Sequence, residues 1–230
     1  MKGSVCAFGA WMSLIVKWLG HSSFQFRTSS DKVIYIDLKK YGKVVETSEK
    51  ADIILVTHNH GDHCSPPKIE KLCKKDTSII APKDCAKRIS GNVKTLKPGE
   101  EITVDNVRVA AVEAYNIKRF KPSGKPWHPR GYGVGYLIMA EGKTIYHAGD
   151  TDFIPEMRSL GKIDLALVPT GEKYTMDNVE AAEATVAIKP KIAMPMHTWD
   201  NDRTEFKAKV EAKSKTKVVL LQEGEEYKLA

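Results

Sequence analysis

The sequence predicts an α/β fold, a four-layer αββα sandwich in which two mixed β-sheets pack face to face and are flanked by helices. Two patterns favour it. Hairpin-like pairs of β-rich runs occur early in the chain, and strand-like runs alternate with helical segments later. Hairpins combined with strand–helix units build two sheets, and amphipathic helices cover their outer faces.

Short runs with the length and apolar content of strands recur along the chain. Two of these runs contain a tight turn, at Asp105-Asn106 and at Glu141-Gly142, and therefore predict hairpins. The predicted strands span residues 14–19, 23–27, 33–37, 52–57, 77–81, 101–114, 133–148, 164–169, 191–196 and 217–221.

Helical patterns fall between the strands. Residues 66–75 open with prolines suited to a first helical turn, and residues 203–213 are amphipathic. In residues 177–188, Glu180 follows Asp177 by three positions, which is typical of a capped helix N-terminus. We expect these helices to lie on the outside of the sheets.

We expect one domain over residues 1–230, with residues 1–11 as an extension outside its core, because Met12 opens the first strand-like segment. The apolar stretch near the N-terminus is broken by Gly9 and Lys17, so we expect neither a membrane span nor a signal peptide. The four cysteines form no C-x-x-C pair, which favours a cytoplasmic location.

The chain is basic, with a formal net charge of +7. Its lysines are scattered in pairs such as Lys39-Lys40, which favours a solvated surface first and a basic cleft for an anionic substrate second. A nucleic-acid groove is the least favoured interpretation. We expect a small-molecule substrate, and homo-oligomer formation is left open.

The stretch LVTHNHGDHCS, residues 55–65, concentrates metal-ligand side chains. His58, His60, Asp62 and His63 lie within six positions, directly after an apolar strand-like run. Gly61 permits the tight backbone path that brings neighbouring side chains to one point. Imidazole and carboxylate at this spacing suit zinc or a similar divalent ion, so the stretch predicts a metal site rather than a solvated turn.

HNHGDH resembles the H-x-H-x-D-H signature of the metallo-β-lactamase superfamily. Further segments follow in the order of that superfamily: WLGHSSF (18–24), YID (35–37), IYHAGDT (145–151) and PMHTW (195–199). Within it, the chain is similar to compact metal-dependent hydrolases related to ascorbate-6-phosphate lactonase and to N-acyl-phosphatidylethanolamine phospholipase D. The resemblance implies the metallo-β-lactamase fold.

The resemblance also implies a binuclear metal centre. Two divalent ions would share a bridging hydroxide, with zinc favoured and manganese or iron as alternatives. The implied ligands are His58 and His60 with one more histidine at the first ion, Asp62, His63 and His197 at the second ion, and Asp150 as the bridge.

The third histidine of the first ion departs from the superfamily pattern. Many relatives place it just after the strand that corresponds to residues 107–114, where this chain has Tyr115 and Asn116. The next histidine is His128, in a loop between two predicted strands that can reach back over the site. We assign His128 to the first ion, with Asn116 or water as the alternative.

Other polar residues are candidates to support the ligands. Asp37 is the best candidate to hydrogen-bond a ligating histidine and fix its tautomer. His21 and His147 lie at predicted strand ends, where each either supports a ligand in the same way or is a buried polar residue. Cys64 directly follows His63 and is expected to be a buried, inert thiol.

The implied activity is hydrolysis of an ester, a lactone or a phosphodiester by a metal-bridged hydroxide, which Asp62 helps to position. Cationic side chains near the site, including Lys118 and Arg119, favour a small anionic substrate. The expected pocket residues are Asn116, Arg130, Lys173, Tyr174 and Trp199.

Two other functions fit the same residues. A single-iron enzyme acting on thioesters or persulfides would also use histidine and aspartate ligands. A scaffold that binds a ligand without turnover is the non-enzymatic alternative, and the intact ligand set argues against it. A superfamily nuclease would be expected to carry an extra nucleic-acid-binding arm, and a flavodiiron protein would be expected to have glutamate in place of His60.

Overall fold

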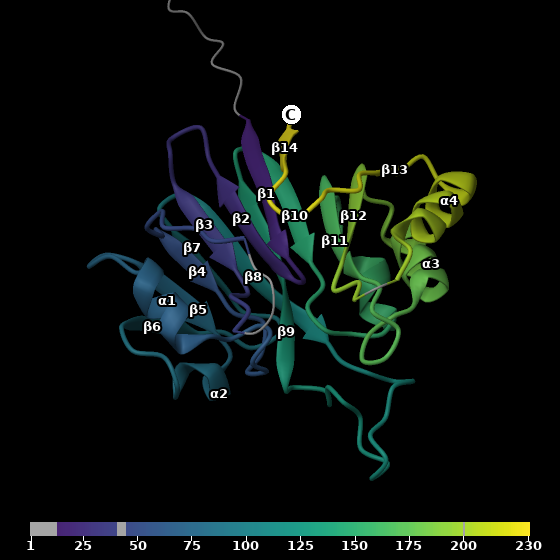
Figure 1. Ribbon diagram of the computed structural model, residues 1–230, viewed down its shortest axis with the longest axis horizontal. Coiled ribbons are helices and arrows are strands. Elements are labelled where there is room, and N and C mark those ends of the chain that lie inside the picture. Colours follow the sequence, from purple (N-terminus) through teal and green to yellow (C-terminus); the bar gives the residue numbers. More distant parts are fainter. Residues whose placement is uncertain (1–12, 41–44, 200) are drawn as a thin grey trace, which may run out of the picture.

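The computed structural model describes residues 13–40, 45–199 and 201–230, so the extension expected at residues 1–11 lies outside the described residues. Within the described residues, two seven-stranded sheets pack against each other, and helices cover the outer face of each (Figure 1). The predicted four-layer αββα sandwich of two mixed sheets is therefore confirmed. None of the described helices is long and apolar enough to cross a membrane.

The first sheet contains, from edge to edge, β14 (Glu226–Leu229), β1 (Leu14–Gly20), β2 (Ser23–Arg27), β3 (Val33–Ile36), β4 (Ile53–Leu55), β5 (Ser78–Ala81) and β6 (Asn92–Thr95). Its β14, β1, β2 and β3 pair antiparallel, whereas β3, β4, β5 and β6 pair parallel. The parallel half brings the C-terminal ends of neighbouring strands to one edge of the sheet.

The second sheet contains β13 (Lys217–Val218), β12 (Ile192–Met196), β11 (Leu165–Pro169), β10 (Lys143–His147), β9 (Gly133–Ala140), β8 (Val107–Ala114) and β7 (Glu101–Val104). Its β10 to β13 pair parallel and its β7 to β10 pair antiparallel. Both predicted hairpin turns are present, because Asp105, Asn106, Glu141 and Gly142 all have positive φ, as tight hairpin turns require.

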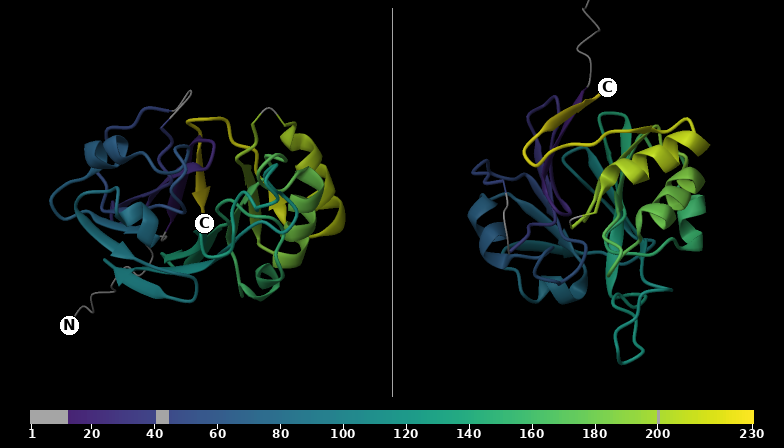
Figure 2. Two further views of the ribbon diagram at one scale, coloured as in Figure 1. Left: turned by 90° about the horizontal axis from the view of Figure 1, so that it is seen from below. Right: turned by 45° about the vertical axis from the view of Figure 1, so that its right-hand side comes forward.

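The helices lie outside the two sheets (Figure 2). In both views, α1 and α2 lie on the side of the first sheet, and α3 and α4 lie on the side of the second. The Asp177 side chain accepts a hydrogen bond of 2.8 Å from the Glu180 backbone N–H and caps α3, as the sequence predicts. The helices are α1 (Pro66–Leu72), α2 (Lys83–Ala86), α3 (Asn178–Ile188), α4 (Arg203–Lys213) and a 3₁₀ turn, η1 (Pro155–Ser159).

Buried side chains of β3 alternate between two hydrophobic layers. Ile34 and Ile36 point into the layer between the sheets, whereas Val33 and Tyr35 point into the layer beneath α1. Because successive strand residues face opposite sides, a strand buried on both faces must be apolar throughout. Cys64 is fully buried in the layer beneath α1.

A few short elements differ from the sequence prediction. The sequence does not predict β6, whose residues are exposed or only half-buried, nor the four-residue edge strand β14. The predicted strand at 217–221 pairs only over Lys217–Val218. The helices α2 and η1 are also missing from the prediction, because segments of four and five residues carry little periodicity.

Candidate metal centre

The candidate ligands follow strand ends in both sheets. His21 directly follows β1, His197 directly follows β12, and Asp150 lies three residues after β10. Residues 58–63 lie in the loop after β4, and His128 comes from the long loop between β8 and β9. Chain segments far apart in sequence therefore meet at one end of the sandwich, where the C-terminal ends of parallel strands gather.

The first group of ligand-type side chains consists of His58, His60, His128 and Asp150, each of which offers an atom within 4.8 Å of the others. His60 Nδ1 lies 3.0 Å from His58 Nε2 and 3.2 Å from His128 Nε2. The Asp150 Oδ2 atom lies 3.3 Å from His128 Nε2. His128 thus lies beside His60 and Asp150, within the first group.

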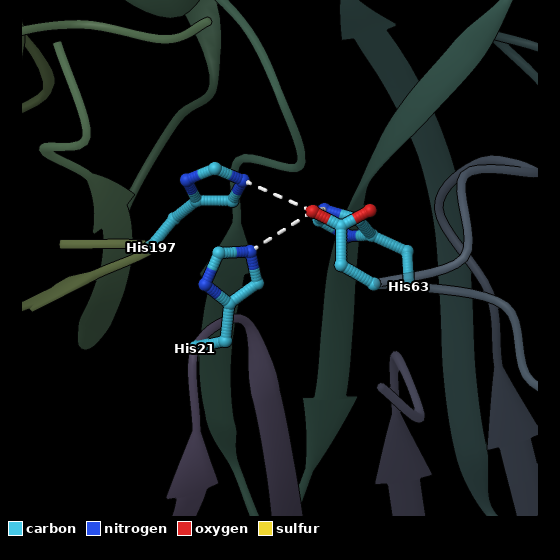
Figure 3. Close-up of side chains that lie close together, drawn as sticks. His21, His63 and His197 are labelled. Carbon is cyan, nitrogen blue, oxygen red and sulfur yellow. Dashed lines mark hydrogen bonds and ion pairs between the residues drawn. The ribbon is translucent and has the colours of Figure 1, made fainter. Parts of the chain in front are cut away.

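The second group consists of His21, Asp62, His63 and His197, whose ligand atoms also lie within 4.8 Å of one another. Figure 3 shows the rings of His21, His63 and His197 converging from three segments of the chain. Asp150 is a member of the first group and also faces the second. Its Oδ1 is 3.3 Å from His63 Nε2 and its Oδ2 is 3.2 Å from His197 Nε2, so it lies between the two groups.

His21 lies closer to the centre than a purely supporting residue needs to be. Its Nε2 atom is 3.2 Å from Asp62 Oδ2, and its ring centroid is 3.8 Å from that of His197. Burial lowers the His21 pKa to about 4, so its ring is neutral at pH 7. His21 is therefore within reach of an ion bound by the second group.

Several buried ligand-type atoms have no hydrogen-bond partner in the described part of the chain. Three of them lie at the centre and face one another: His63 Nε2, His197 Nε2 and Asp150 Oδ1. Nearly all buried polar atoms in folded proteins are hydrogen-bonded, so an unpartnered cluster of this kind needs a reason. A divalent cation between imidazole nitrogens and a carboxylate would satisfy all of these atoms, and this donor set suits zinc. The residues therefore fit a metal centre.

Asp37 holds the loop that carries the signature histidines. Its Oδ1 accepts a hydrogen bond of 2.8 Å from the Thr57 backbone N–H, and its Oδ2 accepts one of 2.7 Å from the Thr57 hydroxyl. The same Oδ2 lies 2.7 Å from His63 Nδ1. A carboxylate only accepts, so His63 Nδ1 carries a proton and its Nε2 faces the centre.

Asn116 supports His128 from behind. The Asn116 Oδ1 atom accepts the His128 backbone N–H at 2.9 Å and lies 2.8 Å from His128 Nδ1. The Asn116 amide group donates to Asp152 Oδ1 and to the Tyr174 carbonyl, which fixes its orientation. His128 Nδ1 must then donate to Asn116, and its Nε2 is free to bind an ion. Asn116 is thus placed beside His128 and not at the centre itself.

The sequence gives no indication of the part that Asp152 plays. Its Oδ2 accepts backbone N–H groups of Ile117 and Lys118 at 2.7 and 2.6 Å. Its Oδ1 accepts the Arg119 guanidinium at 2.9 Å, in addition to the Asn116 amide. Asp152 therefore fastens the start of the β8–β9 loop that carries His128.

His147 links two of the segments without facing an ion. The Gly149 backbone N–H donates to its Nδ1 at 3.2 Å, and its Nε2 donates to the Ser22 carbonyl at 2.9 Å. Both ring nitrogens are occupied, so His147 joins the turn beside His21 to the loop beside Asp150.

Backbone strain is concentrated around the centre. His21, Asp37, His197 and Trp199 have φ between 45° and 54°, in the left-handed region that non-glycine residues seldom occupy. Such conformations cost free energy and persist where the surrounding structure enforces them, often at functional sites. The backbone is therefore held in the shape that directs these side chains inward.

Among the histidines of the centre, some have a lowered pKa and one has a raised pKa. Burial lowers the pKa of His58 well below its ordinary value and that of His128 to about 4. Burial also opposes protonation of His63, but the Asp150 and Asp37 carboxylates outweigh it and raise the His63 pKa well above its ordinary value. In the metal-free chain, therefore, His58 and His128 are neutral at pH 7, whereas His63 carries a proton that an ion must displace.

A pocket of about 330 Å³ opens over the centre. Of the expected pocket residues, Tyr174 and Trp199 line it. Trp127 lines it as well, although the sequence does not single it out. The complete lining is His60, Gly61, Asp62, Trp127, His128, Asp150, Tyr174, His197 and Trp199.

The expected pocket residues Asn116, Arg130 and Lys173 do not line the pocket. Asn116 is buried behind His128, as described above. The exposed Arg130 forms ion pairs of 2.9 Å with Glu113 and Glu156, which hold it outside. The Lys173 ammonium lies over the Tyr174 ring, 5.2 Å from its centroid.

The two other cations that favour an anionic substrate are also paired. Lys118 lies 3.1 Å from Glu180, and Arg119 forms ion pairs with both Asp152 and Glu180. These groups organise the β8–β9 loop, so they give no support to an anion site at the centre.

Comparison with known proteins shows similarity over most of the chain. Residues 15–197 match the Beta-lactamase superfamily domain. The chain is 38% identical to the UPF0173 metal-dependent hydrolase of Thermococcus kodakarensis over 229 residues, covering 93% of this chain and 99% of that protein. It is 32% identical to that of Pelotomaculum thermopropionicum over 228 residues, with coverage of 93% and 99%.

Among solved structures, a proposed metal-dependent hydrolase from Parabacteroides distasonis superimposes with a TM-score of 0.83 at 34% sequence identity. The superposition covers 92% of this chain and 94% of that one. The family match at residues 15–197 includes every segment that contributes to the two groups of ligands.

Proposed function

The chain belongs to the metallo-β-lactamase superfamily and, within it, to the UPF0173 family of metal-dependent hydrolases, and from this membership we propose that it is a binuclear enzyme. It would hydrolyse an ester, a lactone or a phosphodiester with a metal-bridged hydroxide, and zinc is the favoured metal. The first ion would be held by His58, His60 and His128. The second would be held by Asp62, His63 and His197, with Asp150 between the two ions.

The position of Asp150 carries the proposal. Its two carboxylate oxygens face histidines of both groups, at 3.3 Å for Oδ1 and at 3.2 and 3.3 Å for Oδ2. Burial would raise the Asp150 pKa, but His197 and His63 together hold it well below its usual range. A short, buried, ionised carboxylate between two sets of imidazoles suits a bridge between two cations.

Two bound ions would supply a hydroxide nucleophile at neutral pH and polarise the substrate oxygen. Asp62 lines the pocket and is held by His21, whose hydrogen bond and neighbouring histidines outweigh burial and lower the Asp62 pKa. As an ionised acceptor on the pocket wall, Asp62 would help to position the attacking hydroxide by accepting a hydrogen bond from it. Asp37 and Asn116 would hold His63 and His128 with Nε2 directed inward.

Metal content tests the proposal directly. Protein reconstituted with zinc and then dialysed should retain close to two ions per chain by elemental analysis, because both groups bind. Asp150→Ala should lower that content with the fold intact by circular dichroism. The exposed Asp76→Ala serves as the matched control and should retain both ions. No bound metal after reconstitution would refute the proposal. Retention of a single ion by protein reconstituted with iron instead of zinc would favour the single-iron alternative.

Activity is tested by a substrate panel of lactones, carboxylic esters and phosphodiesters with added zinc or manganese. Hydrolysis of at least one class should be lost in His60→Ala and on chelation, and restored to the native protein by metal. Two retained ions without turnover of any class would favour the ligand-binding scaffold.

A further inference from the structure

The described residues that line the pocket are of two kinds. Six of the nine lining residues belong to the metal centre or to its signature loop. The remaining three are all aromatic: Trp127, Tyr174 and Trp199. Whatever part of a substrate extends beyond the reacting bond therefore meets aromatic surface.

The three rings form a connected wall, although they come from separate segments of the chain. The Trp127 and Tyr174 ring centroids lie 4.7 Å apart with an interplanar angle of 81°. The Tyr174 and Trp199 ring centroids lie 6.3 Å apart, and the Trp199 centroid lies 5.6 Å from that of His197. The wall thus extends from the second group of ligands outward to the β8–β9 loop.

Part of the aromatic surface of this wall is exposed to solvent. Trp199 is 52% exposed, and Trp127 and Tyr174 are half-buried. The backbone of Trp199 is held at a φ of 45°, so the position from which its ring extends is fixed by the fold. Rigid aromatic faces beside a reactive centre favour stacking with a flat group, since ring pairs gain energy beyond the area they bury.

Among the residues that the structure describes, no lysine or arginine lines this pocket. The ammonium groups of Lys121 and Lys173 lie over two rings of the wall, 5.4 Å from the Trp127 centroid and 5.2 Å from the Tyr174 centroid. A phosphate or carboxylate next to the reacting bond would therefore find no lysine or arginine to pair with in the described lining. An uncharged flat group would find three aromatic rings to contact.

We propose that this pocket selects a substrate in which an uncharged aromatic or conjugated ring is attached next to the hydrolysed bond and stacks on Trp127 and Tyr174. The inference rests on the proposed function, because the bond must lie over the metal centre. It replaces the small anionic substrate that the sequence favours, since the cations behind that expectation are paired elsewhere.

Three hydroxamic acids test the inference without turnover, because all of them bind divalent ions through the same group. They are benzohydroxamic acid, acetohydroxamic acid and phosphonoacetohydroxamic acid, titrated calorimetrically into zinc-loaded protein. Benzohydroxamic acid should bind about tenfold more tightly than acetohydroxamic acid, an advantage in the range of ring stacking plus burial. The phosphonate should give no such gain.

Trp127→Ala should reduce the advantage of benzohydroxamic acid to about threefold or less and leave acetohydroxamic acid unaffected. Tyr174→Leu should act in the same direction and covers the case in which Trp127→Ala does not fold. Phe120→Ala is the matched control, since Phe120 is a 50% exposed aromatic residue on the same loop that does not line the pocket. It should keep the full advantage.

Tightest binding by the phosphonate, or an advantage of the benzo compound that survives both Trp127→Ala and Tyr174→Leu, would overturn the inference while leaving the metal centre in place. Failure of acetohydroxamic acid to bind, with no zinc retained, would instead refute the proposed function and the inference with it. The small hydroxamate thus separates the two failures.

Discussion

The Asn116 Oδ1 atom lies 2.8 Å from His128 Nδ1 and also accepts the His128 backbone N–H at 2.9 Å. One side-chain oxygen therefore fixes both the backbone and the ring of the residue that the first ion would need. The amide is itself held by Asp152, which receives backbone N–H groups from the same loop. The geometry of His128 thus depends on a chain of hydrogen bonds behind it.

Asn116→Ala should weaken metal binding at the first site about 10- to 100-fold, which is the usual effect of removing a partner that orients a ligating histidine. The second site should change little, because Asn116 touches none of its residues. Competition with a chromophoric chelator measures both affinities. Asn92→Ala, at an exposed position of β6, is the control. Equal affinities in Asn116→Ala and Asn92→Ala would exclude this role for Asn116.

The signature loop was predictable from the sequence because its ligand-type residues are adjacent in the chain. Asp150 and His197 could be named only through the order of superfamily motifs, since nothing local separates them from other polar residues. His128 followed from the shortage of histidines. The approach of all of them to one centre is visible only in the folded chain.

Asp152 and Trp127 could not be predicted, for a physical reason. Asp152 acts through backbone N–H groups of a loop whose path the sequence does not specify. Trp127 belongs to the pocket because that same loop turns its ring toward Tyr174. Arg130 was predicted to line the pocket and does not. Its ion pairs with Glu113 and Glu156 join residues that are distant in sequence, so the sequence does not reveal them.

The two metal sites should differ in their pH dependence. The His63 pKa is raised well above its ordinary value, so its proton is bound at neutral pH and competes with the second ion. Affinity at that site should therefore rise with pH between 6 and 8, by up to about tenfold per unit for one released proton. Titrations with zinc at several pH values would show this.

The first site provides the internal comparison for that titration. The His58 pKa is lowered well below its ordinary value and the His128 pKa is about 4, so these rings are already neutral at pH 6. First-site affinity should then be nearly constant from pH 6 to 8. If both sites showed the same slope, His63 would not hold the displaced proton.

Asp52 should stabilise the fold in a pH-dependent manner away from the metal centre. It is buried, and its Oδ1 lies 2.8 Å from the Lys74 ammonium and 3.2 Å from the Lys32 ammonium. Burial opposes its ionisation, but these lysines and the Val33 N–H outweigh burial and lower the Asp52 pKa. Asp52→Asn should reduce the free energy of unfolding at pH 7 by about 1–3 kcal/mol.

Because the folded pKa of Asp52 is depressed, its contribution is present above the unfolded value of about 3.9 and is lost as the pH falls through the folded pKa. Urea unfolding of the native chain and of Asp52→Asn should therefore differ at pH 7 and converge below about pH 4. Asp105→Asn, which removes an exposed partner of the same Lys32, should cost less than about 0.5 kcal/mol. A constant difference from pH 7 to pH 3 would contradict this assignment.

Gly149 should be essential for the position of Asp150, the next residue. Its φ is +65°, and a Cβ atom there would lie 2.7 Å from the Val134 carbonyl oxygen of β9. The Val134 N–H in turn donates to the Thr57 carbonyl at the start of the signature loop. Gly149→Ala should therefore displace Asp150 and the signature loop together, and elemental analysis should show loss of both ions.

Gly142 offers a matched comparison, because its φ is +69° and a Cβ atom there would meet nothing within 4 Å. Both alanine variants carry the same left-handed strain, about 1–2 kcal/mol, and should lose similar stability from that source. Only Gly149→Ala adds the clash with β9. If Gly149→Ala keeps two ions while melting like Gly142→Ala, the backbone beside Asp150 has freedom to adjust, and the bridge does not depend on the close contact with Val134.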